Sequence, residues 1–110
     1  TGGNSFSATT LFASALIKQD NVTVVGEETG GGGYGNSAWL IPDVTLPETK
    51  VRFRLPLFRL VIDKTLPKNG RGLQPEVESF PTVGAIRRNA DFKAEKAMEL
   101  IKTDKESIKN

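Results

Sequence analysis

The fold is decided by residues 1–33, which read TGGNSFSATTLFASALIKQDNVTVVGEETGGGG. A turn-rich start leads into a helix predicted over 7–18, because apolar side chains recur there at the i, i+4 spacing of one face. The β-branched run 22–25 then predicts a short buried strand, and a glycine-rich loop follows it. This order of elements indicates a mixed α/β domain. The helix residues expected to face the core are Leu11, Phe12, Ala15 and Leu16.

The rest of the chain predicts a β meander and closing helices. Residues 51–55 alternate apolar and basic side chains, as in a half-exposed strand, and short apolar strands are expected over 39–41 and 60–62. Asp91 is predicted to be the N-cap of a final helix. We expect the folded part to span residues 1–103, with 104–110 as a polar, frayed tail. The predicted apolar stripe of the final helix consists of Ala94, Ala97, Met98 and Ile101.

The composition limits the chemistry that the chain can perform. Its 110 residues are enough for one domain, and they include no Cys and no His. A disulfide framework, a thiolate nucleophile, a zinc knuckle, an iron–sulfur site and a complete Ser-His-Asp triad are therefore excluded. We expect neither a metal nor a cofactor. Catalysis that needs an imidazole must take it from outside these residues, and the first residue, Thr1, indicates an excised or processed piece.

The charge is unevenly distributed. Residues 1–49 hold one basic and five acidic side chains, whereas residues 50–110 hold fourteen basic and eight acidic ones. Such a skew can indicate a nucleic-acid surface. Here the basic residues are interleaved with acids and almost no aromatic residues accompany them near the C-terminus, so a solvated basic face is favoured. No apolar run approaches the roughly 18 residues that a membrane span needs.

Ser7 is the first candidate for chemistry. It lies where a glycine-rich turn leads into the predicted helix, among unpaired backbone N–H groups and the positive end of the helix dipole. The amide of the next residue, Ala8, can then stabilise a developing oxyanion. The alternative is an ordinary N-cap, a role that Ser5 can fill equally well.

The glycine run after the predicted strand is the second candidate. A phosphate-binding P-loop is excluded, because no Gly-Lys-Ser/Thr follows the run and no helix begins there. A flexible loop, or a groove wall that contacts an extended peptide through Gly31, Gly32 and Gly33, fits better. Glu27 and Glu28 precede the run. Because adjacent side chains on an extended chain point apart, a polar loop is favoured over a shared-proton carboxylate pair.

Three motifs in order, GGNSFSATT, VGEETGGG and GRGLQPEV, resemble the C-terminal processing (tail-specific) serine peptidases, including their tricorn-core-like members. The sequence of these motifs is most similar to that of Bacteroidetes-type members. The resemblance covers about residues 1–101 and corresponds to the C-terminal half of the catalytic domain. It implies part of a crotonase/ClpP-like α/β spiral and a serine endopeptidase that works through an acyl-enzyme. It also implies an extracytoplasmic location, in the periplasm or cell envelope.

The resemblance assigns Ser7 as the nucleophile and the Ala8 amide as one oxyanion donor. The family's second donor is a glycine further upstream, outside this chain. In tail-specific members the general base is a lysine 25 positions after the nucleophile, and that position here is Gly32. Tricorn-like members use a histidine from an earlier segment instead. We therefore expect an N-terminal half of the same protein to supply the histidine base and the second oxyanion donor.

Two further positions depart from the family pattern. The glutamate that assists the histidine in tricorn-like members corresponds to a position near Asn69, where no carboxylate is evident. Glu76 replaces the usual aspartate after proline, and we expect it to have a structural role.

These features leave three hypotheses open. The first is a serine endopeptidase that binds a peptide or protein substrate along an exposed strand edge. The second is a catalytically inactive pseudopeptidase that binds peptides or other ligands. The third is a structural piece, which a buried Ser7 without an open pocket would favour. Three arginines, any of which can pair with a substrate carboxylate or form a solvated strand face, are Arg52, Arg54 and Arg59.

Overall fold

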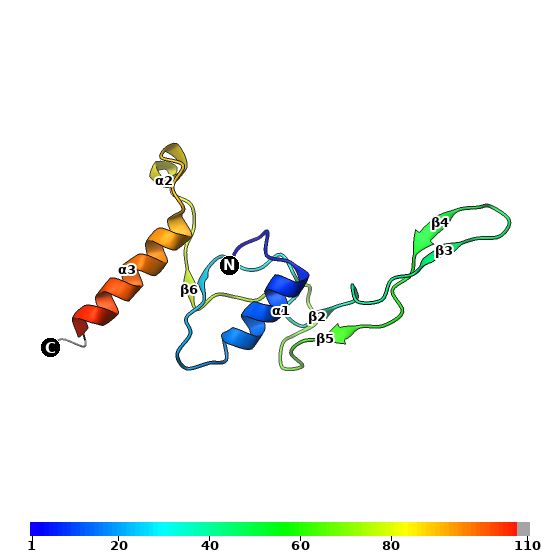
Figure 1. Ribbon diagram of the computed structural model, residues 1–110, viewed down its shortest axis with the longest axis horizontal. Helices are drawn as coiled ribbons and strands as arrows, with labels where there is room; N and C mark the ends of the chain where they lie inside the picture. Colours follow the sequence, from blue (N-terminus) through cyan, green and yellow to red (C-terminus); the bar gives the residue numbers. More distant parts are fainter. Residues whose placement is uncertain (108–110) are drawn as a thin grey trace.

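The structure, a computed structural model, describes residues 1–107. It has the mixed α/β character that the sequence predicts, with helices and small sheets along one chain (Figure 1). In chain order the elements are α1 (Ser7–Leu16), β1 (Val25–Gly26), β2 (Gly35–Asn36), β3 (Asp43–Thr45), β4 (Arg52–Arg54), β5 (Leu60–Val61), β6 (Val77–Glu78), α2 (Val83–Arg87) and α3 (Phe92–Ser107). The strands form three pairs: β1–β6 parallel, β2–β5 antiparallel and β3–β4 antiparallel.

The parallel pair β1–β6 brings together segments that are far apart in sequence. Val25 lies opposite Val77 in this pair. Just before it, the Val24 amide donates to the Glu76 carboxylate at 2.8 Å, and the Glu76 amide donates to the Val24 carbonyl at 2.9 Å. Glu76 therefore extends the strand pairing by one residue, which is the structural role expected for it.

The buried face of α1 is not the face that its apolar spacing predicts. The buried side chains belong to Thr10, Ala13 and Ser14, whereas Leu11 and Phe12 are 40% and 65% exposed. The prediction of an apolar core face on this helix is therefore wrong. The physical reason is close backbone packing, because a Cβ added at Gly31 would lie 2.4 Å from the Thr10 hydroxyl. Only small side chains fit between this helix and the glycine loop.

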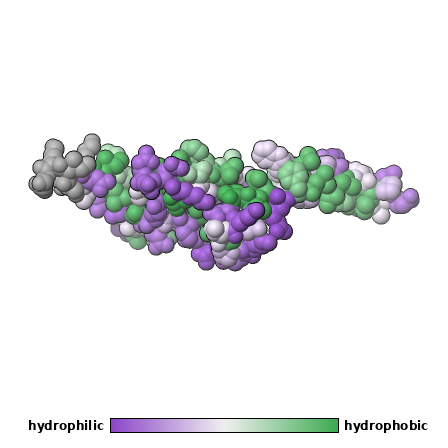
Figure 2. Space-filling model, turned by 90° about the horizontal axis from the view of Figure 1, so that it is seen from below, coloured by the Kyte–Doolittle hydropathy of each residue, from purple (hydrophilic) through white to green (hydrophobic). Residues whose placement is uncertain are grey.

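Residues 38–58 form an arm that extends away from the rest of the molecule and ends in the β3–β4 hairpin (Figure 1). Its length explains a radius of gyration of 19.0 Å, compared with about 13 Å for a compact chain of this size. Figure 2 shows apolar surface along the arm. The exposed apolar side chains there are Trp39, Leu40, Leu46, Val51, Phe53, Leu55, Leu57 and Phe58.

Several predicted strands differ in extent from those observed. The strand predicted over 22–25 is observed as β1, Val25–Gly26, and shares only Val25 with the predicted range. The strand predicted over 39–41 is absent. The glycine-rich segment is not wholly irregular, because Gly35–Asn36 pairs with Leu60–Val61 as β2 and β5. The strand predicted over 51–55 is confirmed in its central part as β4.

The C-terminal helix begins where the sequence predicts. The Ala94 amide donates to the Asp91 carboxylate at 3.0 Å, so Asp91 caps α3. The helix continues to Ser107, past the expected start of a polar tail, and residues 108–110 lie outside the described residues. Its predicted stripe is not a core face, since Met98 and Ile101 are about half exposed. In the part of the chain described, no helix combines the length and apolarity that a membrane crossing needs.

Candidate active site

Ser7 stands at a sharp change of backbone direction. Phe6 is extended, with φ −114° and ψ 166°, and α1 begins at the next residue. Ser7 itself has a φ of +41°, in the left-handed region that residues with a Cβ rarely adopt. Strain of this kind concentrates at functional sites, and a strained turn into a helix is how α/β-hydrolases expose their nucleophile. Ser7 is an exposed residue.

The backbone around Ser7 leaves a donor free. The amides of Thr9 and Thr10 both donate to the Phe6 carbonyl, at 2.9 and 3.4 Å. Within residues 1–107, the Ala8 amide has no acceptor and the Ser7 hydroxyl has no hydrogen-bond partner. An unpaired amide directly after a serine can donate to an oxyanion formed on that serine's target carbonyl. The geometry of this turn therefore fits the predicted roles of both residues.

Gly31 lies directly against this turn. Its amide donates to the Ser5 carbonyl at 2.9 Å, and the same carbonyl accepts from the Thr10 hydroxyl at 3.0 Å. A Cβ added at Gly31 would lie 2.9 Å from the Ser7 backbone nitrogen. A side chain at this position would therefore displace the turn that carries the serine. Gly31 is therefore the residue through which the glycine run contacts the serine turn.

The other two predicted glycines lie against a different segment. Gly32 forms an isolated antiparallel bridge with Gly72, and the Gly33 amide donates to the Arg71 carbonyl at 3.0 Å. The glycine run thus contacts the serine turn at its start and the GRGLQPEV segment at its end. Gly32 is engaged in backbone pairing and has no side chain that could act as a base.

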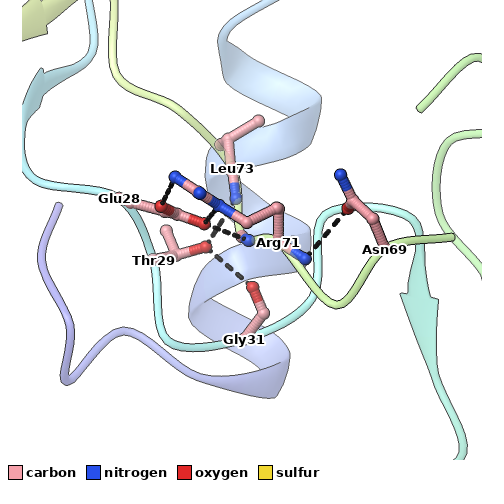
Figure 3. A network of polar contacts seen from close by, with 7 residues as sticks. Glu28, Thr29, Gly31, Asn69, Arg71 and Leu73 are labelled. Atoms are coloured by element: carbon pink, nitrogen blue, oxygen red, sulfur yellow. Dashed lines mark hydrogen bonds and ion pairs between the residues drawn. The ribbon is translucent and has the colours of Figure 1, made fainter. Parts of the chain in front are cut away.

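A network around Thr29 connects these two contacts (Figure 3). The Thr29 side chain is buried; its hydroxyl donates to the Gly31 carbonyl and accepts from the Leu73 amide, both at 2.8 Å. The Thr29 amide also donates to the Leu73 carbonyl at 3.0 Å. Gly72 is required here, because a Cβ would lie 1.9 Å from the Thr29 carbonyl oxygen. Sequence reasoning did not single out Thr29, although the VGEETGGG motif contains it.

Glu28 is held in the same network. Its carboxylate accepts from the Arg71 guanidinium at 2.8 and 2.5 Å and from the Gly72 amide at 2.6 Å (Figure 3). These contacts lower the pKa of Glu28 from 4.5 to about 2, with the Arg71 hydrogen bond as the largest cause, followed by Gln74 and Gly72. A carboxylate stabilised in its charged form to this extent is a poor general base near neutral pH. Glu28 is therefore a structural anion.

The neighbouring Glu27 has a different partner. Its carboxylate pairs with the Lys93 ammonium at 2.5 Å, which connects the strand end to α3. The two adjacent carboxylates thus serve separate ion pairs, and the expectation that they form no shared-proton pair is confirmed. The Asn69 side chain accepts a hydrogen bond from the Arg71 amide at 3.1 Å and so shapes a turn.

The three candidate arginines have different surroundings. Arg52 and Arg54 both lie within ion-pair distance of Asp43 across the hairpin, at 3.4 and 4.0 Å. Among the described residues Arg59 has neither an ion pair nor a hydrogen bond. The same residues contain no group of three or more His, Cys, Asp or Glu that could hold a metal ion.

In comparisons with known proteins, no family model and no curated protein matches this chain.

Proposed function

We propose that this chain supplies the nucleophile and one oxyanion donor of a serine endopeptidase. The observation that carries the proposal is the backbone at Ser7. This exposed serine has a left-handed φ at the first residue of a helix, and the following amide, that of Ala8, is unpaired. A plain helix N-cap does not require this conformation, because N-cap residues have β-region dihedrals.

In the proposed reaction, Ser7 Oγ attacks the carbonyl carbon of the scissile peptide bond. The hydroxyl proton passes to a general base, and the Ala8 amide donates to the oxyanion of the tetrahedral intermediate. Collapse of that intermediate breaks the C–N bond, and the leaving amine takes up the proton. A water molecule then attacks the acyl-enzyme with help from the same base, which releases the acid product and restores the hydroxyl.

The base in this proposal lies outside these 110 residues. The chain contains no His, and Gly32 replaces the lysine of tail-specific members. A histidine from an N-terminal half of the same protein would act as the base, and a glycine from that half would supply the second oxyanion donor. The fold proposed for the assembled domain is the crotonase/ClpP-like spiral, in an extracytoplasmic compartment. The contact between the VGEETGGG and GRGLQPEV motifs through Thr29 supports this assignment.

A specific observation favours one alternative, a pseudopeptidase that binds peptides without cleaving them. The Ser7 hydroxyl is offered neither the lysine of tail-specific members, whose position is Gly32, nor the glutamate of tricorn-like members, whose position is near Asn69. In an active enzyme a base must come within hydrogen-bond reach of that hydroxyl. The third hypothesis, a purely structural piece, is not favoured, since Ser7 is exposed.

Peptide cleavage by the full-length protein tests the proposal. We expect Ser7→Ala to lower the rate at least about 10⁴-fold, as removal of a serine nucleophile does. The matched control is Thr9→Ala, which removes an exposed hydroxyl from the same helix turn and should leave the rate within a factor of about two, as for surface substitutions. Equal cleavage by the wild type and Ser7→Ala would refute the role of this serine. Peptide binding without any cleavage would support the pseudopeptidase.

A further inference from the structure

A cavity of about 310 Å³ opens beside the end of the glycine run. Its size is at the lower limit of the roughly 300–1,000 Å³ typical of small-ligand sites. One of its lining residues is Gly32, which follows Gly31, the glycine that contacts the Ser7 turn. The remaining lining residues are Tyr34, Gly35, Asn36, Ser37, Arg59, Lys68, Gly70 and Arg71.

The charged side chains of this cavity are all basic. Arg71 is neutralised by Glu28, whereas Arg59 has no ion pair within the described residues. The Lys68 ammonium also has no carboxylate partner there and lies 5.1 Å from the centre of the Tyr34 ring. This cation–π contact holds the ammonium at the cavity. The cavity thus carries two uncompensated positive charges and no acid.

Such a set of groups suits a carboxylate. A guanidinium donates two parallel hydrogen bonds to a carboxylate, and an ammonium adds a second, more flexible charge. The cavity wall includes β2, which within residues 1–107 pairs with β5 along one edge and with no strand along the other. An extended peptide can add to the other edge as a further strand, and every second side chain would then point to the same face. A peptide bound beside β2 would therefore present a side chain or its terminus to Arg59 and Lys68.

We propose that this cavity is a subsite for a peptide carboxylate, held by Arg59 and Lys68. The proposal rests on the proposed function in one respect, because it takes the ligand to be the peptide that Ser7 would attack. The carboxylate comes either from an Asp or Glu side chain or from the peptide's C-terminus. The chemistry of the subsite is the same in both cases.

Binding of three labelled pentapeptides to the full-length protein tests this subsite. The first has a central Glu and an amidated C-terminus, the second a central Gln and an amidated C-terminus, and the third a central Gln and a free C-terminus. Fluorescence anisotropy gives each Kd in a Ser7→Ala background, so that cleavage does not interfere. The test variant combines Arg59→Gln with Lys68→Gln. The matched control combines Arg87→Gln with Lys64→Gln, which removes the same charges from exposed positions outside the cavity.

We expect one of the two carboxylate peptides to bind more tightly than the neutral one, and the peptide that does so identifies the source of the carboxylate. In the test variant the Kd of that peptide should rise about two- to fivefold for each charge removed, and in the control variant it should not change. The preference should also shrink as salt is raised from 0.05 to 0.5 M. Equal binding of all three peptides, or equal losses in the test and control variants, would overturn the proposal. Because binding is measured without Ser7, these outcomes do not depend on whether Ser7 is a nucleophile.

Discussion

Arg71 holds the carboxylate of Glu28 through two parallel hydrogen bonds, from Nε to Oε1 at 2.8 Å and from Nη2 to Oε2 at 2.5 Å. The two residues are 43 positions apart in sequence. The Glu28 side chain is 28% exposed, and the Gly72 amide also donates to it. This contact fixes the GRGLQPEV segment against the residues that precede the glycine run, and so helps to place Gly31 at the Ser7 turn.

Two carboxylates make the folded state sensitive to acid. Hydrogen bonds lower the pKa of Glu28 to about 2, chiefly from Arg71, and the pKa of Asp63 to about 2, chiefly from Thr65 and then Lys18. Because these pKa values lie below the ordinary 4.5 and 3.8, both groups stabilise the folded state fully above about pH 5. That contribution is lost as the pH falls toward 2.

Urea unfolding between pH 7 and pH 2 measures this effect. We expect the urea concentration at the unfolding midpoint of the wild type to decrease as the pH is lowered from about 5 to 2. The decrease should be smaller in a variant with Glu28→Gln and Asp63→Asn. The double variant should be less stable than the wild type at pH 7. An identical pH dependence in the two proteins would show that these ion pairs do not contribute to stability.

Gly31→Ala tests the contact between the glycine run and the serine turn. The added methyl would lie 2.4 Å from the Thr10 hydroxyl and 2.9 Å from the Ser7 nitrogen. We expect a loss of about 1–3 kcal/mol in the free energy of unfolding, and a fall of about 10²-fold in cleavage through displacement of the serine. Gly3→Ala is the control, since a methyl there meets nothing within 4 Å. Similar effects from both substitutions would argue against this contact.

Thr29→Val tests the network that connects the two motifs. The substitution keeps the shape of the side chain but removes the hydroxyl that bonds the Gly31 carbonyl and the Leu73 amide. We expect it to lower the free energy of unfolding by about 1–3 kcal/mol, because buried polar groups lose their partners. Thr9→Val, at an exposed helix position, should change it by less than about 0.5 kcal/mol. Thermal or urea unfolding of both variants measures the difference. An unchanged free energy of unfolding in Thr29→Val would show that the network does not stabilise the fold.

Features set by local sequence were predictable. The start of α1 at Ser7, the capping of α3 by Asp91 and the strand around Phe53 each follow from a cap, a turn or an alternation visible within a few residues. At Ser7 and Ala8 the structure shows a left-handed φ at the first residue of α1 and, within residues 1–107, an unpaired amide after it. Their catalytic role stays a prediction.

Features set by contacts between distant segments were not predictable. The spacing of Leu11 and Phe12 indicated a core face, but close packing of Gly31 against Thr10 decides which side of α1 is buried. No local pattern pairs Glu28 with Arg71, since their contact depends on how the chain returns after the arm. The arm is a further example. The alternation over 51–55 predicted a half-exposed strand, yet the apolar side chains of Val51, Phe53 and Leu55 are exposed as well.

The isolated 110-residue chain should have no peptidase activity. It contains no His, and none of its described residues offers a base to the Ser7 hydroxyl. A sensitive fluorogenic peptide assay on the purified chain measures this, with the full-length protein as the positive control. Cleavage by the isolated chain that disappears in Ser7→Ala would contradict a base supplied from elsewhere.

Covalent labelling of the full-length protein with a fluorophosphonate tests the central claim most directly, because the probe reacts with an activated serine hydroxyl. Mass spectrometry of the digested protein then locates the phosphonyl group. We expect it on Ser7, with labelling abolished in Ser7→Ala and retained in Thr9→Ala. Equal labelling of the wild type and Ser7→Ala, or a phosphonyl group on any other residue, would contradict the assignment of Ser7 as the nucleophile.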